Sequence, residues 1–416
     1  MTYIEFFDRI SIENICACLI AQPDRVILLG NSKKVLARHV ERYRRIFADR
    51  ALAVTVDYDN VISGDIDATV SKLIEIVERE KTCVFDITGG DETLMVAVGI
   101  VYERYRENDC GISLSLYRSN VKSVPGTAAR DSEQPAEGSV ALTVEENVML
   151  YGGDIAYSDE HPNGTYRWDM NDDFCRDIEV LWQLCRQDLR SWNVQIDMLG
   201  AIEEARSAES TPLCTVTTVS ALERVLDGEN KEYRYLPNTV NALLSAGYLT
   251  EFSREGNVIR VGYQNEQIKR CLTRAGQALE MKVFLAMRRV CDKRGVPRFS
   301  DVMNGVYMDW DGVLHADPWA VDAVNEIDIM AMRGLVPYFV SCKNGKVTAD
   351  ELYKLHTVAT RFGGTYAKKV LVVNSLKKDH ASNTLRQRAE EMDIRLIENV
   401  HRMKNDDELY RELLKI

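Results

Sequence analysis

Several features that define other classes of protein are missing from this sequence. It contains no run of about 18 apolar residues, so we expect no membrane-spanning helix. Residues 1–5 lack the basic and then apolar regions of a signal peptide, and the ten cysteines show no paired metal-ligand spacing. We therefore expect a cytoplasmic protein whose thiols are reduced and mostly buried.

An excess of positive charge is also missing. The chain has 64 acidic and 52 basic residues, and its formal net charge of -12 argues against a protein that coats nucleic acid non-specifically. A local basic groove is still compatible with this charge. The sequence contains neither a GxGxxG nor a Walker A motif, which disfavours dinucleotide binding and ATP hydrolysis. With 416 residues, 45% of them hydrophobic, we expect a globular protein of two or three domains.

The first part of the chain alternates apolar strands with amphipathic helices. We expect strands at residues 25–30, 52–56, 82–87 and 112–116, and helices at 32–48, 66–77 and around 94–101. Alternation at this spacing predicts an α/β fold with a parallel sheet covered on both faces. The aperiodic Ser/Gly/Pro/Glu-rich stretch at 121–140 then predicts a boundary.

Two loops at the carboxyl ends of these strands carry residues suited to a phosphate-rich ligand. The candidate ligand-binding residues are Gly30, Asn31, Ser32 and Lys33 in the first loop, and Thr88, Gly89, Gly90, Asp91, Glu92 and Thr93 in the second. Adjacent glycines let backbone N–H groups approach a ligand closely, and the N-terminus of a helix favours phosphate. Open α/β sheets bind their ligands at this edge. The alternative is that the glycines only permit a tight turn.

The middle of the chain is mainly helical. We expect a short helix closed by glycine at 142–152 and a strongly helical stretch at 172–206, whose Trp182 and Trp192 pack in a core between domains. We expect residues 239–261 to form a helix that leads into two apolar runs, which is the winged-helix pattern. Such a module can read DNA, or it can be a structural spacer or a dimerisation wedge. The absence of Arg and Lys between residues 239 and 250 weakens the DNA-reading interpretation.

The last part of the chain predicts a second α/β unit. It begins with a helix at 276–293 and continues with two apolar runs, 325–329 and 339–343, which a Gly/Pro-containing break separates. These two runs predict a β-hairpin. We then expect a helix at 348–362, a strand at 369–373, and terminal helices at 382–392 and 405–415 on either side of a strand at 394–397.

The hairpin brings an acidic residue and a lysine to one end. Asp328 is the candidate central metal ligand, Lys343 is the candidate catalytic lysine, and Glu280 on the preceding helix is the candidate second carboxylate. Glu326, two residues from Asp328, points to the same face of the strand. Carboxylates that hold Mg²⁺ or Mn²⁺ beside a lysine are what phosphodiester hydrolysis requires, because the cation activates water and the lysine stabilises negative charge. Taken singly, each residue could simply be a solvated charge.

This arrangement resembles the PD-(D/E)xK nuclease superfamily, whose pattern is a helix Glu, a strand Asp and then (D/E)-x-K on the next strand. Ser341 stands where the third acidic residue would be. The resemblance implies a restriction-endonuclease-like fold, and it implies that the main-chain carbonyl of Cys342 is a metal ligand.

The second loop resembles the signature of CARF domains, the cyclic-oligoadenylate sensors of type III CRISPR defence, with Asp91 and Glu92 in place of the usual Thr-Lys. Residues 5–15 look like the start of such a domain. The last part, including the Ser-Cys-Lys sequence at 341–343, is similar to the nuclease domain of CARF-fused effectors.

The resemblance implies three regions: a Rossmann-like CARF sensor at 1–155, a helical and winged-helix-like region at 156–270, and a PD-(D/E)xK-like nuclease domain at 271–416. It implies an antiviral nuclease that acts on DNA or RNA, either single-stranded or supercoiled. It also implies a homodimer, with cyclic oligoadenylate as the activator and cyclic tetra-adenylate as the expected ring. Two alternatives remain: a ligand-controlled winged-helix transcription regulator with a degenerate nuclease domain, and a ring nuclease that degrades the cyclic ligand itself.

Overall fold

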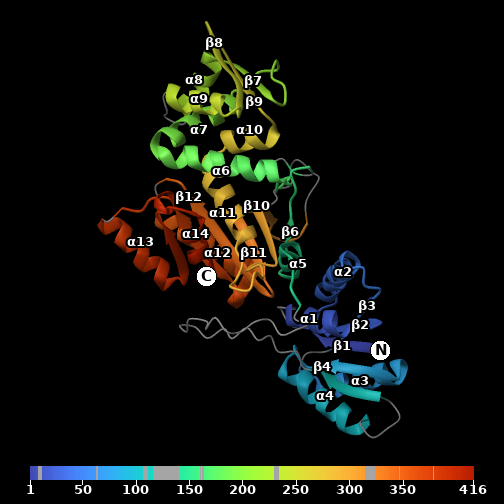
Figure 1. The fold of residues 1–416 in the computed structure, drawn as a ribbon. Coiled ribbons are helices and arrows are strands. Elements are labelled where there is room, and N and C mark those ends of the chain that lie inside the picture. Colours follow the sequence, from blue (N-terminus) through green and yellow to red (C-terminus); the bar gives the residue numbers. More distant parts are fainter. Residues whose placement is uncertain are drawn as a thin grey trace.

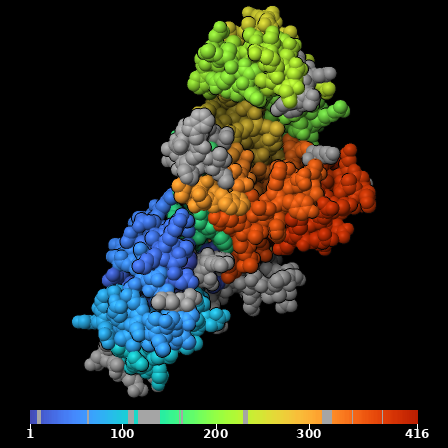
Figure 2. Space-filling model, turned by 180° about the vertical axis from the view of Figure 1, so that it is seen from behind, coloured from blue at the N-terminus to red at the C-terminus, as the bar shows by residue number. Residues whose placement is uncertain are grey.

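The structure is a computed structural model of the 416-residue chain. The molecule is elongated, and its C-terminal body lies between the N-terminal body and a third body formed by the middle of the chain (Figures 1 and 2). It describes residues 1–7, 12–61, 64–105, 111–115, 140–159, 161, 164–228, 234–313, 324–345, 347–377 and 379–416. Asp8 and Arg9 of the predicted opening motif, Leu116 of the predicted fourth strand, and the predicted boundary segment at 121–139 lie outside these residues.

The N-terminal body is a parallel five-stranded sheet of order β3-β2-β1-β4-β5. Its strands are β1 (Thr2–Phe6), β2 (Arg25–Gly30), β3 (Thr55–Asn60), β4 (Thr82–Asp86) and β5 (Gly111–Ser115). Its helices are α1 (Ile12–Ala21), α2 (Lys33–Asp49), α3 (Ile66–Glu80) and α4 (Glu92–Tyr105). The predicted Rossmann-like alternation is confirmed, and both loops lie at the carboxyl edge of the sheet.

Two details of this sheet differ from the prediction. The fully buried β1 occupies the centre of the sheet but was not predicted as a strand. The strand predicted at 52–56 begins only at Thr55, because the end of α2 continues into a left-handed turn at Ala51 (φ 54°) and Leu52 N–H still bonds to Phe47 O.

The C-terminal body is a six-stranded mixed sheet of order β14-β13-β12-β11-β10-β6. Its strands are β6 (Asp154–Ile155), β10 (Asp301–Asp309), β11 (Val324–Arg333), β12 (Val336–Lys343), β13 (Lys368–Val373) and β14 (Ile394–Glu398). Its helices are α5 (Val144–Leu150), α11 (Gln277–Arg289), α12 (Ala349–Gly363), α13 (His380–Glu391) and α14 (Asp406–Leu414), with short 3-10 turns η1 (Gly364–Tyr366) and η2 (Val400–Arg402). Helices α11 and α14 pack in one core with Val340 and Cys342, while α5, α12 and α13 pack in another with Phe339 and Leu371.

The hairpin of β11 and β12 is confirmed, and Gly334 in its turn has a positive φ of 61°. The predicted helix at 276–293 is shorter, because the chain becomes extended at Val290 and Cys291 bridges to Pro297. Strand β10 was not predicted. The short strand β6 pairs with β10, so residues 154–155 belong to the C-terminal sheet although they fall within the predicted sensor region.

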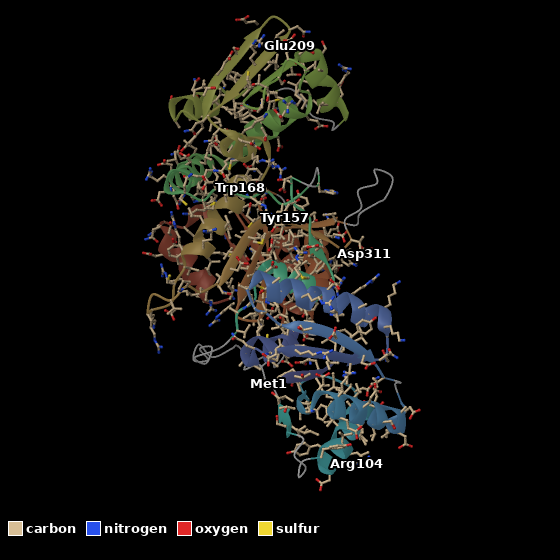
Figure 3. The ribbon with its side chains drawn as sticks, turned by 90° about the vertical axis from the view of Figure 1, so that its right-hand side faces the viewer. Met1, Arg104, Tyr157, Trp168, Glu209 and Asp311 are labelled. Atoms are coloured by element: carbon tan, nitrogen blue, oxygen red, sulfur yellow. The ribbon has the colours of Figure 1, made fainter. Side chains whose placement is uncertain are left out.

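The third body lies on the side of the C-terminal body opposite the N-terminal body (Figure 1). Its helices are α6 (Asp172–Gln187), α7 (Leu189–Glu204), α8 (Val219–Gly228), α9 (Pro237–Ser245) and α10 (Glu266–Thr273), and its strands are β7 (Cys214–Thr218), β8 (Leu249–Glu255) and β9 (Val258–Tyr263). The stretch predicted as strongly helical at 172–206 is two helices, because Asp188 ends α6 and its side chain caps α7. In the side view, Tyr157 and Trp168 mark the connection from β6 to α6 (Figure 3).

Helices α8 and α9 with the antiparallel sheet β7-β9-β8 form the predicted winged-helix-like arrangement. Trp182 and Trp192 are buried in the core that this body shares with α11 and with Val340 and Cys342 of the C-terminal sheet. The cysteines in the described part of the chain have free thiols and are mostly buried, with Cys214 and Cys291 nearer the surface. No described helix is both long and apolar enough to cross a membrane.

Candidate catalytic and ligand-binding sites

The hairpin brings Asp328 and Lys343 together. The register pairs Ile329 with Val340, which places Asp328 beside Ser341. Oδ2 of Asp328 accepts hydrogen bonds from the Ser341 hydroxyl at 3.1 Å and from the Cys342 N–H at 2.6 Å, and Lys343 Nζ lies 3.6 Å away. None of these bonds uses Oδ1 of Asp328. Ser341 therefore helps to hold the carboxylate in place.

Lys343 is a protonated lysine between two carboxylates. Its Nζ lies 3.2 Å from Glu351 on the first turn of α12, and the side chain is 30% exposed. Burial acts to lower the pKa of Lys343, but Asp328 and Glu351 raise it, and the net direction is upward. The ammonium group thus keeps its charge. Glu351 was not predicted, since acidic residues in the first turn of a helix, here Asp350 and Glu351, are also what the helix dipole favours.

Glu280 completes an acidic cluster from the facing helix α11. Burial, and then the charges of Asp328 and Glu326, raise the pKa of Glu280 well above its ordinary value. Burial and Asp328 likewise raise the pKa of Glu326, against hydrogen bonding from Tyr307. Arg274, which was not predicted, lowers the pKa of both glutamates. The structure therefore brings together the three predicted residues Glu280, Asp328 and Lys343.

Two buried amides fix the backbone beneath this cluster. Asn304 on β10 donates a hydrogen bond to the carbonyl oxygen of Asp328 at 3.0 Å, and Gln277 on α11 donates to Asn304 Oδ1 at 3.4 Å. Both side chains are at least 95% buried. Neither was predicted, because their role depends on β10 pairing with β11 and on α11 packing against both strands.

The donor set suits a hard divalent cation. In the described part of the chain no group of three or more His, Cys, Asp or Glu side chains has metal-binding geometry, so a cation at the hairpin would bind through fewer side chains than that. The negative charge of Asp328 contributes to the raised pKa of Glu280. A cation bound between the two carboxylates would relieve this repulsion. The N–H and C=O of one strand residue point to the same edge, so the Cys342 carbonyl faces β11 as its N–H does. The Lys343 carbonyl points the other way, to Asn374.

The two predicted ligand loops meet in a small recess of about 40 Å³. Gly30 and Asn31 line one side of it, and Asp91 and Thr93 line the other. Asp91 Oδ1 accepts a hydrogen bond from Leu94 N–H at 2.9 Å, so it caps α4. Ser32 occupies the predicted N-cap of α2 but makes no capping hydrogen bond. Lys33 and Glu92, the first residues of α2 and α4, are exposed.

Thr88, Gly89 and Gly90 fit tightly over a buried polar cluster. A Cβ on Gly89 would lie 2.7 Å from both Asn14 Oδ1 and Phe6 O, and Gly90 has a φ of +107°. Asn14 donates a hydrogen bond to Glu5 Oε2 at 2.6 Å, and Glu5 is 1% exposed. Burial, with Asp86 next to it, raises the pKa of Glu5 well above its ordinary value. The sequence signal for this cluster was weak, because β1 was not predicted.

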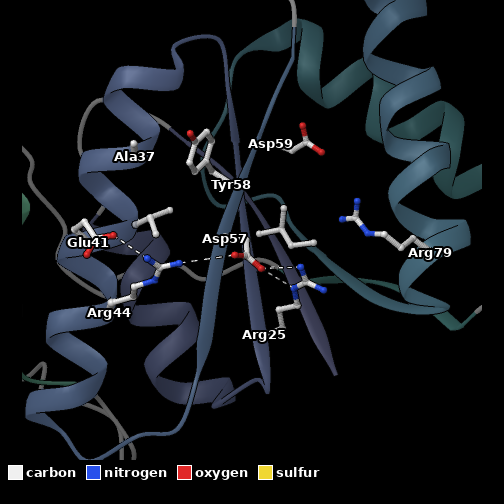
Figure 4. A pocket seen from close by; sticks show the side chains of 10 residues that line it. Arg25, Ala37, Glu41, Arg44, Asp57, Tyr58, Asp59 and Arg79 are labelled. Atoms are coloured by element: carbon white, nitrogen blue, oxygen red, sulfur yellow. Dashed lines mark hydrogen bonds and ion pairs between the residues drawn. The ribbon is translucent and has the colours of Figure 1, made fainter.

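A larger cavity, of about 330 Å³, lies away from these loops along the edge strand β3 (Figure 4). Asp57 stands at its centre, with Arg25 at 2.6 Å and Arg44 at 3.8 Å. These ion pairs hold the edge strand between β2 and α2. The cavity contains none of the predicted ligand residues.

No protein-family model matches the chain, and no curated protein matches it. Solved structures do. Protein VC1899 from Vibrio cholerae is 16% identical, with a TM-score of 0.64 over 100% of this chain and 97% of that one. Can2 from Sulfobacillus thermosulfidooxidans, solved in complex with cyclic tetra-adenylate, is 18% identical, with a TM-score of 0.59 over 100% and 98%. A type III CRISPR defence DNA nuclease activated by cyclic oligoadenylate matches more loosely, at 12% identity and a TM-score of 0.44, over 91% of this chain and 46% of that one. The chain therefore has the fold of VC1899 and Can2 from end to end.

Proposed function

We propose that this protein is a nuclease that cyclic oligoadenylate activates and that requires a divalent metal ion. The observation that carries the proposal is the cluster of Glu280, Asp328 and Lys343 at the end of the hairpin. It occurs in a chain that shares the fold of Can2 over its whole length, and Can2 was solved with cyclic tetra-adenylate. We assign residues 1–155 to the sensor, 156–270 to a connecting region and 271–416 to a PD-(D/E)xK-like nuclease domain. The last elements of the first region, α5 and β6, pack on the C-terminal sheet and so form the junction between sensor and nuclease.

The chain's own residues supply much of the chemistry. The ammonium of Lys343, kept charged by its two carboxylate neighbours, would stabilise negative charge on a phosphodiester. Ser341 and the Cys342 N–H orient Asp328. Mg²⁺ or Mn²⁺, held by Glu280, Asp328 and the Cys342 carbonyl, would supply charge neutralisation and a more acidic bound water.

The size of the recess at the ligand loops supports a homodimer. A pocket for a ligand of drug size measures about 300–1,000 Å³, and the recess in one chain has only about 40 Å³. Cyclic tetra-adenylate is larger than such a ligand and has rotational symmetry. Two copies of the chain that bring their recesses together across a two-fold axis would form a site of matching symmetry.

The winged-helix-like arrangement does not favour a transcription regulator. Helix α9, which would enter the major groove, has no Arg or Lys in its sequence PNTVNALLS. Specific contacts in that groove rely most often on Arg and Lys side chains. We therefore propose that this body is structural, since Trp182 and Trp192 join it to the core beside the hairpin.

The test is a panel of labelled DNA and RNA substrates, single-stranded, duplex and supercoiled, incubated with Mg²⁺ or Mn²⁺ and with each cyclic oligoadenylate in turn. We expect cleavage that requires the metal and rises sharply with cyclic tetra-adenylate. Asp328→Asn and Lys343→Ala should each lower the rate by about a thousandfold or more. Asp350→Asn is the matched control, because Asp350 is exposed on the same helix turn as Glu351.

Cleavage at the native rate by Asp328→Asn would refute the site assignment. Linear adenylate products that persist in the Asp328→Asn variant would show instead that the sensor degrades its own ligand.

A further inference from the structure

We propose that Glu351 is a positioning residue for Lys343, and that helix α12, which carries it, is the element through which the sensor acts on Lys343. This proposal rests on the proposed function and adds its regulation. A series of contacts runs from the ligand loops through α2, α5 and α12 to Lys343.

The first contacts link the ligand recess to helix α2. The loop of Gly30 and Asn31 leads directly into α2, and Phe7, which also lines the recess, packs its ring against His39 of α2 with centroids 4.2 Å apart. His39 is 6% exposed. A ligand that moves the loop or Phe7 must therefore displace α2 or its buried ring.

The next contacts join α2 to α5, which lies between α2 and the C-terminal sheet (Figure 1). Arg50, at the end of α2, donates two hydrogen bonds of 2.6 Å to the carboxylate of Glu146, whose side chain is 6% exposed. Arg45 forms a second ion pair with Asp154 at 3.2 Å. A bidentate, largely buried pair of this kind fixes orientation as well as distance.

Helix α5 in turn holds the end of α12. Asn147, which is fully buried, donates a hydrogen bond of 2.7 Å to the carbonyl oxygen of Phe362. Arg361, one residue earlier, donates to the carbonyl oxygens of Tyr151 and Trp310. The C-terminal end of α12 is thus hydrogen-bonded to residues 147–151, and the same helix α5 forms the ion pair with the end of α2.

Two like charges also meet at this junction. A Cβ on Gly152 would lie 3.4 Å from Arg42 Nη2 and 3.5 Å from Arg361 Nη2, so both guanidinium groups pack against the same glycine. Burial, together with the charges of Arg38 and Arg361, lowers the pKa of Arg42. Because like charges repel, the junction stores an unfavourable interaction that a shift of α2 would relieve or increase.

The far end of α12 reaches the catalytic lysine. Glu351 and Arg361 are ten residues apart on one uninterrupted helix, about 15 Å along its axis. Glu351 lies 3.2 Å from Lys343 Nζ. A packed helix moves as a unit, so a displacement at Arg361 changes the position of Glu351 and hence that of the ammonium group.

The experiment uses the full chain, cyclic tetra-adenylate as the probe, and the substrate that the panel above identifies. Three variants are compared with the native protein: Arg361→Lys and Arg50→Gln at the junction, and Glu351→Gln at the lysine, with Asp350→Asn as the matched control. Calorimetry measures ligand binding, and hydrogen exchange of residues 349–363 reports on α12 independently of activity.

In the native protein we expect the ligand to change the exchange of α12 and to stimulate cleavage. Arg361→Lys and Arg50→Gln should still bind the ligand, but the ratio of stimulated to basal cleavage should fall about tenfold and the exchange change should be lost. Glu351→Gln should lower kcat about tenfold without changing KM, and Glu351→Asp should restore part of it.

Junction variants that keep the native ratio and the native exchange change would overturn the proposal while leaving the proposed function intact. If Arg361→Lys does not fold, Arg50→Gln decides the matter, since the Arg50 side chain is 28% exposed. If the native protein neither binds cyclic tetra-adenylate nor is stimulated by it, the proposed function fails first and this inference fails with it.

Discussion

Replacing Gly89 by alanine should destabilise the N-terminal body through a contact with its buried polar cluster. The added Cβ would lie 2.7 Å from Asn14 Oδ1 and from Phe6 O, one of them main chain that cannot turn away. Overpacking of this kind costs about 1–3 kcal/mol. Displacing Asn14 also breaks its bond to the buried carboxyl of Glu5, which adds about 1–3 kcal/mol.

The reduced freedom of the unfolded chain returns about 0.5 kcal/mol, so we expect a net loss of about 1.5–5.5 kcal/mol. Gly99 on α4 provides the matched control. A Cβ there has no atom of the described chain within 4 Å, and Gly99→Ala should stabilise the helix by about 0.5–1 kcal/mol. The two Gly→Ala changes therefore carry opposite predicted signs within one body of the protein.

The assay is urea denaturation followed by hydrogen exchange and mass spectrometry of peptides from residues 1–105. All five tryptophans lie at position 168 or later, so tryptophan fluorescence reports the remainder of the chain and should be unchanged. Affinity for cyclic tetra-adenylate, measured in parallel, should fall at least about tenfold, because a shift of about 1.4 kcal/mol at the loop suffices. Equal midpoints for Gly89→Ala and the native protein would refute the packing argument.

Three further predictions follow from other parts of the structure. Burial lowers the pKa of His39 to about 3, below its unfolded value of about 6.5, so the unfolded chain takes up the proton first and stability is lost as the pH falls between these values. Urea denaturation should show that the native protein loses about 2 kcal/mol of stability from pH 7 to pH 5, and that the His39→Gln variant does not. Lys282 is 2% exposed and lies between two carboxylates. Lys282→Met should cost about 1 kcal/mol of folding stability and Lys282→Ala about 2–4 kcal/mol, measured by tryptophan fluorescence in urea, because only the Ala variant loses the buried aliphatic part of the side chain. Gly276→Ala should lower the cleavage rate about tenfold, since Gly276 has a φ of +87° and an added Cβ would lie 3.1 Å from Glu280 Oε1. An unchanged rate would argue that Glu280 has no part in the reaction.

Local patterns predicted most elements of this fold. The hairpin is an example: two apolar runs, a Gly/Pro break, and charges at one end are all neighbours in the sequence, and the register that joins Asp328 to Lys343 follows from the length of the turn. The phosphate-type loops were equally visible, because a glycine pair between a strand and a helix is a local signal. Glu280 lies on a different element, far from the hairpin in the sequence. It could be named only as a candidate, because its approach to Asp328 depends on how α11 packs.

The sequence by itself determined the alternation of strands and helices, the two loops, and the residue types that make the acidic and basic cluster. Only the tertiary structure decided which segments become neighbours. It placed β1 at the centre of its sheet, β6 beside β10, and Asn304 beneath Asp328, because these positions depend on pairing partners far along the chain. It also placed Glu351 and Arg361 at opposite ends of one helix, with Arg361 at the junction to the N-terminal body and Glu351 beside Lys343. Periodicity reports only which face of an element is buried, whereas contacts between bodies arise from packing. The connection between the two predicted ligand loops and Lys343 therefore became visible only in three dimensions.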